Sequence, residues 1–167
     1  MKLQYKVISD SSPLIAFIKK RELELLKKLF GEIMIPEAVY SELIKLPERY
    51  IIEKQILESA IQDGWIIVSK LKALKLSKLK LGKGEIEAIN LCFNVQNPLL
   101  LMDEKKGRNL IKTYKIKTLG TLGILILAKR KALKDYDNLL ENLELLLKEG
   151  FYLSSDLITT YLKNIKN

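Results

Sequence analysis

The sequence of 167 residues contains no histidine and only one cysteine. The lack of histidine excludes Ser-His-Asp and Cys-His catalysis, a histidine general base and histidine-ligated zinc. The single cysteine, Cys92, excludes a disulfide bond within the chain and is typical of a reducing compartment. Any hydrolytic chemistry must therefore use carboxylates, lysines, hydroxyl groups or a hard metal ion.

Long apolar runs are also missing from the sequence. Lysine or glutamate interrupts each apolar run well before it could cross a bilayer, and the N-terminus lacks a signal-peptide pattern. We therefore expect a cytoplasmic protein with no membrane partner. The length suits a single domain over residues 1–167, which can bury a core without disulfide bonds.

Basic residues outnumber acidic ones in this chain. There are 29 Lys plus Arg and 20 Asp plus Glu, which gives a formal net charge of +9. The resulting field favours anionic partners such as nucleic acid. An excess of lysine, glutamate and isoleucine is also typical of heat-adapted proteins, so the charge alone leaves both interpretations open.

Apolar, strand-like segments alternate with amphipathic, helix-like segments along most of the chain. Strands are predicted at 5–9, 32–35, 65–68, 99–102 and 115–119. Helices are predicted at 13–18, 22–30, 36–46, 51–63, 85–95, 104–114, 120–132, 137–148 and 155–163. The lysine-rich stretch 69–83 is predicted to be a mobile connector or a short helix. The alternation predicts an α/β fold with a mostly parallel sheet and helices on both faces.

Aspartates follow two of the predicted strands. Asp10 comes after the strand at 5–9, and Asp103 comes after the continuous apolar run at 99–102. Ligands of open α/β sheets gather outside the carboxyl ends of the strands, where a carboxylate can bind a metal ion. Each aspartate could instead cap the helix that follows it.

Two predicted helices could bring further carboxylates to the same edge. Glu85 shares a helix face with Ala88 and Ile89, and Glu42 borders the apolar side of its own helix. The local alternatives are a first-turn acid favoured by the helix dipole for Glu85 and an ion pair with Lys45 for Glu42. Four clustered acids would repel one another without cations, and oxygen ligands alone indicate Mg²⁺ or Mn²⁺.

The chain resembles PIN-domain proteins in five ordered blocks: VISDSSPLI (7–15), IPEAVYSEL (35–43), LGKGEIEAI (81–89), LLMDE (100–104) and GTLG (120–123). It is most similar to the DUF3368 branch, whose members are relatives of VapC toxin ribonucleases. The resemblance covers residues from about 5 to 153 and leaves a C-terminal helical extension at 154–167.

The resemblance implies a three-layer α/β/α PIN-like domain that binds Mg²⁺ or Mn²⁺ and cleaves single-stranded RNA. By position, the catalytic and metal-binding acids of the family fall on Asp10, Glu42, Glu85 and Asp103. Ser12 would be the small polar residue that supports the first acid. Many toxin members carry aspartate as the third acid where this chain has Glu85, whose longer side chain could change the metal geometry. Glu87 is a rival of Glu85 for that role.

Basic residues near these acids are predicted to bind RNA. Arg108 lies about one helical turn beyond Asp103, and its planar guanidinium suits a phosphate group. Lys105 and Lys83 could bind neighbouring phosphates, although each lysine could equally be a solvated surface charge.

Two function classes follow from these patterns. The first is a metal-dependent endoribonuclease, which could be the toxin of a toxin–antitoxin pair with a small antitoxin protein or a second copy of itself as partner. The alternative is a nucleic-acid-binding or regulatory protein with little or no nuclease activity. A phosphatase is disfavoured because the sequence Ser11-Ser12-Pro13 after Asp10 lacks the second aspartate that such enzymes need.

Overall fold

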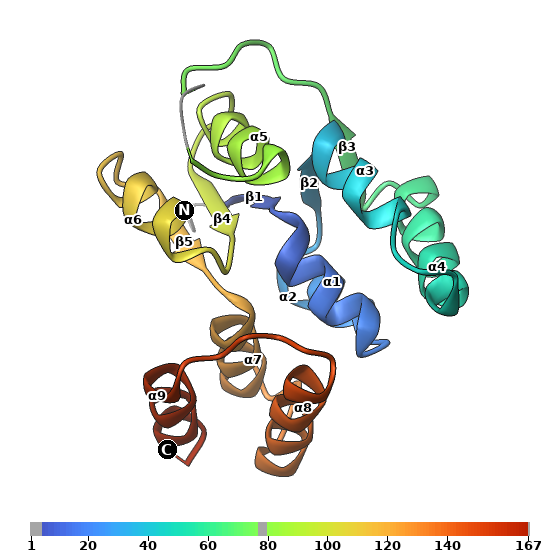
Figure 1. The fold of residues 1–167 in the computed structure, drawn as a ribbon, viewed down its shortest axis with the longest axis vertical. Coiled ribbons are helices and arrows are strands. Elements are labelled where there is room, and N and C mark those ends of the chain that lie inside the picture. Colours follow the sequence, from blue (N-terminus) through green and yellow to red (C-terminus); the bar gives the residue numbers. More distant parts are fainter. Residues whose placement is uncertain (1–4, 77–79, 167) are drawn as a thin grey trace.

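A computed structural model describes residues 5–76 and 80–166, and its strands form one parallel sheet (Figure 1). The strands are β1 (Lys6–Ser9), β2 (Ile33–Pro36), β3 (Ile66–Ser69), β4 (Pro98–Leu101) and β5 (Lys117–Leu119). Their order in the sheet is β3-β2-β1-β4-β5, so β1 is central and β3 and β5 form the edges. The predicted fold class and the parallel sheet are confirmed.

At least one helix lies between each pair of consecutive strands, as the crossover between parallel strands requires. The helices are α1 (Ser11–Lys19), α2 (Leu23–Phe30), α3 (Glu37–Ile44), α4 (Ile51–Gln62), α5 (Lys83–Cys92), α6 (Lys105–Lys112), α7 (Thr121–Arg130), α8 (Tyr136–Lys148) and α9 (Ser155–Lys166). In the described part of the chain, no helix combines the length and the apolar character needed to cross a bilayer.

Two apolar cores cover the two faces of the sheet. Successive side chains along a strand point to opposite faces, so Val7 joins one core and its neighbour Ile8 joins the other. The larger core contains Phe17 of α1 and also includes α7 and α8, whereas the smaller core contains Ile89 of α5 and Ile111 of α6. Burial on both faces explains why the central strands are continuous apolar runs. The helices that cover the two faces form, together with the sheet, the predicted three layers.

The lysine-rich stretch between β3 and α5 is attached to the domain by the buried side chain of Asn90. The Oδ1 atom of Asn90 accepts hydrogen bonds from the backbone N–H groups of Lys75 (2.6 Å) and Leu76 (3.0 Å). Its Nδ2 atom donates to the Leu76 carbonyl at 2.8 Å. The described part of this stretch, 70–76 and 80–82, contains no helix, and Lys78 lies outside the described residues.

A cluster of charged side chains joins the end of α1 to α8. The buried Nζ atom of Lys20 lies 3.1 Å from Glu22 and donates to Asn142 at 3.0 Å, while Lys134 lies 2.6 Å from Glu22. Burial lowers the pKa of Lys20 to about 8, against the opposing effect of Glu22. Burial alone would raise the pKa of Glu22, but Lys20 and Lys134 together hold it below its usual value.

Replacing this central carboxylate is expected to destabilise the fold. Glu22→Gln leaves the ammonium groups of Lys20 and Lys134 facing each other, so the free energy of unfolding should fall by about 2–4 kcal/mol in urea denaturation. The control is Glu24→Gln, since the exposed Glu24 pairs with Lys27 at 4.0 Å and should contribute less than about 0.5 kcal/mol. Equal losses in the two variants would contradict this account.

Candidate active site

The site lies where the order of the strands reverses in the sheet. The central strand β1 has β2 on one side and β4 on the other, and this arrangement opens a crevice outside the carboxyl ends of β1 and β4. Asp10 directly follows β1, and its backbone N–H donates to the Leu101 carbonyl of β4 at 2.9 Å. Asp103 follows β4 by two residues, so both aspartates lie at this edge of the sheet.

Asp10 is the most unusual residue of the site because its carboxylate is fully buried and forms no ion pair with any described residue. Its side chain has 0 % exposure, and its Oδ2 atom finds no hydrogen-bond donor in the described part of the chain. Burial raises the pKa of Asp10 to about 7; the Ser11 backbone opposes the shift, while Glu85, Glu42 and Asp103 add to it. The four predicted acids therefore interact electrostatically at one place.

Glu42 of α3 is half-buried, and both of its carboxylate oxygens accept hydrogen bonds at the site. Its Oε2 atom accepts a hydrogen bond from the Ser11 hydroxyl at 2.5 Å, and its Oε1 atom accepts from the Gly84 backbone N–H at 3.2 Å. A Cβ atom at Gly84 would lie only 2.7 Å from Oε1 of Glu42. The glycine therefore allows the start of α5 to approach this carboxylate closely.

Ser11, rather than Ser12, makes the hydrogen bonds to these acids. Its hydroxyl lies between Asp10, at 3.5 Å from Oδ1, and Glu42, at 2.5 Å. The helix α1 begins at Ser11, and Asp10 occupies the N-cap position without making a side-chain capping bond. The carboxylate of Asp10 therefore does not cap this helix, and the Ser11 hydroxyl in its first turn lies beside the acids.

Glu85 is close enough to Asp10 to raise its pKa, and it also stabilises its own helix. Its Oε2 atom accepts a hydrogen bond from the Gly82 backbone N–H at 2.6 Å, directly before α5. The predicted structural role in the first turn of the helix is therefore observed together with the proximity to Asp10.

Glu87 is engaged elsewhere. Its Oε2 atom accepts from the Ala38 backbone N–H at 3.0 Å, at the start of α3, and its Oε1 atom lies 3.9 Å from the exposed Nζ of Lys83. Glu87 is not among the carboxylates that raise the pKa of Asp10. These contacts distinguish Glu87 from Glu85. They also show that Lys83 pairs with Glu87 within α5.

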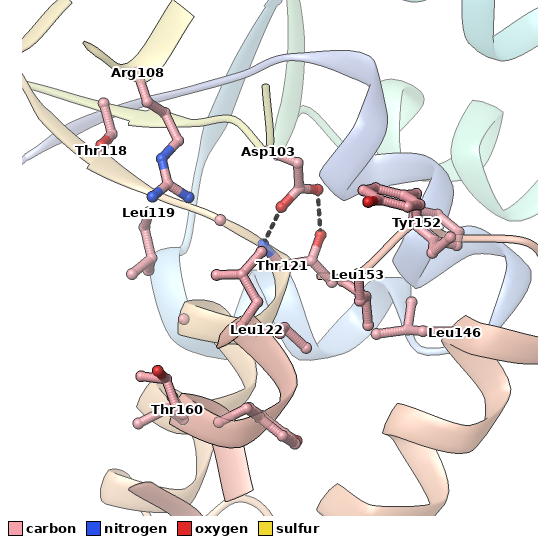
Figure 2. A pocket seen from close by; sticks show the side chains of 16 residues that line it. Asp103, Arg108, Thr118, Leu119, Thr121, Leu122, Leu146, Tyr152, Leu153 and Thr160 are labelled. Atoms are coloured by element: carbon pink, nitrogen blue, oxygen red, sulfur yellow. Dashed lines mark hydrogen bonds between the residues drawn. The ribbon is translucent and has the colours of Figure 1, made fainter. Parts of the chain in front are cut away.

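Asp103 caps α7 across the sheet edge. Its Oδ1 atom accepts from the Thr121 backbone N–H at 2.7 Å, and its Oδ2 atom accepts from the Thr121 hydroxyl at 2.6 Å (Figure 2). The helix that follows Asp103, α6, is instead capped by Glu104, which accepts from the Lys106 backbone N–H at 2.9 Å. The alternative that Asp103 caps the next helix in the chain is therefore wrong.

Arg108 lies beside Asp103. A Cβ atom at Gly120 would meet Oδ1 of Asp103 at 2.8 Å and Nη1 of Arg108 at 3.0 Å, so both groups border the same small space. The Nε atom of Arg108 is buried and has no hydrogen-bond partner among the described residues. Lys105, by contrast, is exposed at the start of α6.

A family model described as DUF3368: PIN domain matches residues 6–167. The chain belongs to this PIN-domain family. Comparison with curated proteins and with solved structures gives no match. The resemblance inferred from the five sequence blocks is confirmed, and the three-layer structure agrees with a PIN fold. PIN domains are generally nucleases and typically use divalent metal ions.

The donor atoms of this PIN domain suit a hard divalent cation. Its site residues offer only oxygen ligands, and the buried Oδ2 of Asp10 has no hydrogen-bond partner in 5–76 and 80–166, as expected of a metal ligand in a protein without its cation. Within 5–76 and 80–166, no three acidic side chains are placed to ligate one ion together. Glu42, Glu85 and Asp103 instead use oxygens to accept hydrogen bonds.

Without a cation, Asp10 is expected to destabilise this PIN domain at neutral pH. Its pKa rises from 3.8 to about 7 on folding, so the unfolded chain ionises first and stability falls as the pH rises through this range. Asp10→Asn removes the cost and should raise the free energy of unfolding at pH 8 by about 2–4 kcal/mol. Urea denaturation in EDTA measures the difference.

This gain should shrink to less than about 1 kcal/mol as the pH falls to about 4, because Asp10 is then protonated in the folded state and close to its ordinary pKa of 3.8 in the unfolded chain. The exposed residue Asp63, at the end of α4, provides the control, and Asp63→Asn should show no comparable dependence on pH. An Asp10→Asn variant with the same stability change at every pH would contradict the argument.

Proposed function

We propose that this PIN domain is an endoribonuclease that cleaves single-stranded RNA with Mg²⁺ or Mn²⁺. The observation that carries the proposal is the fully buried carboxylate of Asp10, one oxygen of which has no hydrogen-bond partner among the described residues and which lies among Glu42, Glu85 and Asp103. Groups with strongly raised pKa values and close charged neighbours are concentrated at functional sites. A divalent cation would remove the repulsion among these acids.

Asp10, Glu42, Glu85 and Asp103 are the residues that would hold the cation. When bound, it would supply a Lewis acid that polarises the phosphodiester and lowers the pKa of water. The Ser11 hydroxyl keeps two of these carboxylates side by side. Thr121 orients the carboxylate of Asp103 through two hydrogen bonds. Such hydrogen bonds would limit the reorganisation needed during the reaction.

Arg108 is the residue proposed to bind the phosphate group next to the acids. Its guanidinium borders Asp103 across the space above Gly120, and its buried Nε atom lacks a partner among the described residues. A guanidinium can donate two parallel hydrogen bonds to phosphate. Lys105 and Lys83 are exposed and would add attraction to the RNA backbone that does not depend on sequence.

A nucleic-acid-binding or regulatory protein with little nuclease activity is the alternative function. It is favoured by one observation, namely that no three of the described acids are placed to share an ion. In that case the hydrogen bonds of Glu42, Glu85 and Asp103 would have a purely structural role, and the basic residues would bind RNA without cleavage.

The proposal includes a role as the toxin of a toxin–antitoxin pair, with a small antitoxin or a second copy of the chain as protein partner. The apolar helical stretches 120–132 and 137–147 are the candidate surfaces for such a partner. Ile124 and Leu125 of α7 are buried in the core, whereas Leu145 and Leu147 of α8 remain exposed. A protein partner would therefore contact α8 rather than the buried face of α7.

The nuclease proposal predicts metal-dependent cleavage of RNA. A panel of fluorescent single-stranded RNAs should be cut with Mg²⁺ or Mn²⁺ and left intact with EDTA. Asp10→Asn and Asp103→Asn should lower the rate by at least about a hundredfold, because each change removes several kcal/mol of charge stabilisation. Asp63→Asn, on the exposed end of α4, should cut as the wild type does. RNA binding without cleavage would instead establish the alternative function.

The close approach of α5 to Glu42 gives a second prediction about activity. Gly84→Ala places a Cβ atom 2.7 Å from Oε1 of Glu42, so it should displace the carboxylate and reduce cleavage by about tenfold or more. In the matched variant Gly82→Ala, the nearest atom to the new Cβ is Glu85 Oε2, at an ordinary 3.4 Å. Wild-type activity of both Gly84→Ala and Gly82→Ala would show that the position of Glu42 does not matter.

A further inference from the structure

An apolar pocket begins at Asp103 and Arg108 and extends along α7 (Figure 2). Its volume is about 300 Å³, at the lower end of the range for sites that bind small organic groups. Leu122 and Ile126 of α7 line it together with Leu153. The pocket therefore continues directly from the carboxylate site into an apolar space.

The opposite wall of the pocket comes from the C-terminal part of the chain. Segment 151–153 and α9 contribute to the lining, including Leu157 and the hydroxyl-bearing residue Thr160, while Thr118 lies on the side of Arg108 (Figure 2). An apolar lining with a few polar groups is typical of sites that bind small organic groups and fix their orientation through hydrogen bonds.

Tyr152 borders this pocket with almost its whole side chain in solvent. At 93 % exposure it is the most exposed large apolar side chain in the part of the chain that the structure describes. Single-stranded nucleic acids are commonly bound by exposed aromatic rings on which bases stack, combined with arginine side chains. Tyr152 and Arg108 provide such a pair at the edge of one pocket.

We propose that this pocket binds one nucleobase of the RNA strand, next to the phosphate held at Asp103 and Arg108. This inference rests on the proposed function, and it adds a specificity pocket to the cleavage site. Tyr152 stacks on the base, the apolar wall of α7 excludes water from it, and the hydroxyl groups of Thr118 and Thr160 contact its polar edge. The net charge of +9 favours a strand of nucleic acid over other apolar occupants.

The test uses one RNA oligonucleotide in which each base near the cleavage position is removed in turn. Wild-type protein should lose about tenfold or more in kcat/KM when one particular base is missing, because base stacking on an aromatic ring contributes this much to binding. Tyr152→Ala should show a similar loss on the intact RNA and no further loss on the RNA that lacks this base.

The matched control is Tyr114→Ala. Tyr114 is also an exposed tyrosine, but it packs edge-to-face on Phe93 and lies outside this pocket. Its replacement should leave the dependence on the missing base unchanged. Fluorescence anisotropy of the same RNAs in EDTA measures binding separately from cleavage.

The outcomes separate the two proposals. Cleavage that is equally efficient for every RNA in the set would overturn the base pocket and leave the nuclease intact. Binding that depends on one base and on Tyr152, without cleavage, would overturn the nuclease and support the pocket. Protein that neither binds nor cuts RNA would overturn both.

Discussion

The burial of Asp10 at the end of the central strand is the constraint on which the rest of the site depends. Its carboxylate has no solvent contact, its pKa is raised to about 7, and one of its oxygens has no hydrogen-bond partner in the part of the chain that the structure describes. The neighbouring acids are instead supplied with hydrogen-bond donors: Ser11 and Gly84 for Glu42, and Thr121 for Asp103. An uncompensated buried carboxylate lowers the stability of the fold, and such a loss of stability is expected at a functional site.

Small residues make this arrangement of acids sterically possible. At Gly84 and Gly120, the space that a Cβ atom would fill is occupied by the side chains of Glu42, Asp103 and Arg108. Backbone segments at the starts of α5 and α7 can therefore approach the carboxylates closely and donate N–H groups to them. The positions of the acids thus depend as much on the absence of side chains as on the acids themselves.

Periodicity and burial made much of the fold predictable from the sequence. Continuous apolar runs identified the central strands and therefore Asp10 and Asp103, and helical spacing indicated that Glu42 and Glu85 border the core. Three features were not predicted: the hydrogen bonds of Ser11 to the acids, the hydrogen bonds of Asn90 to the lysine-rich stretch, and the pocket beside Arg108. Each depends on contacts between segments far apart in the sequence, such as Ser11 with α3, about which local patterns contain no information.

The most direct test of the central claim is to count the protons released when Mn²⁺ binds. Calorimetry in buffers of different ionisation enthalpy gives this number. With the pKa of Asp10 at about 7, the metal-free protein should release about one proton at pH 6 and almost none at pH 8.5. Asp10→Asn should bind Mn²⁺ weakly and release none at either pH. Tight binding by Asp10→Asn, or release that does not change between the two pH values, would contradict the account.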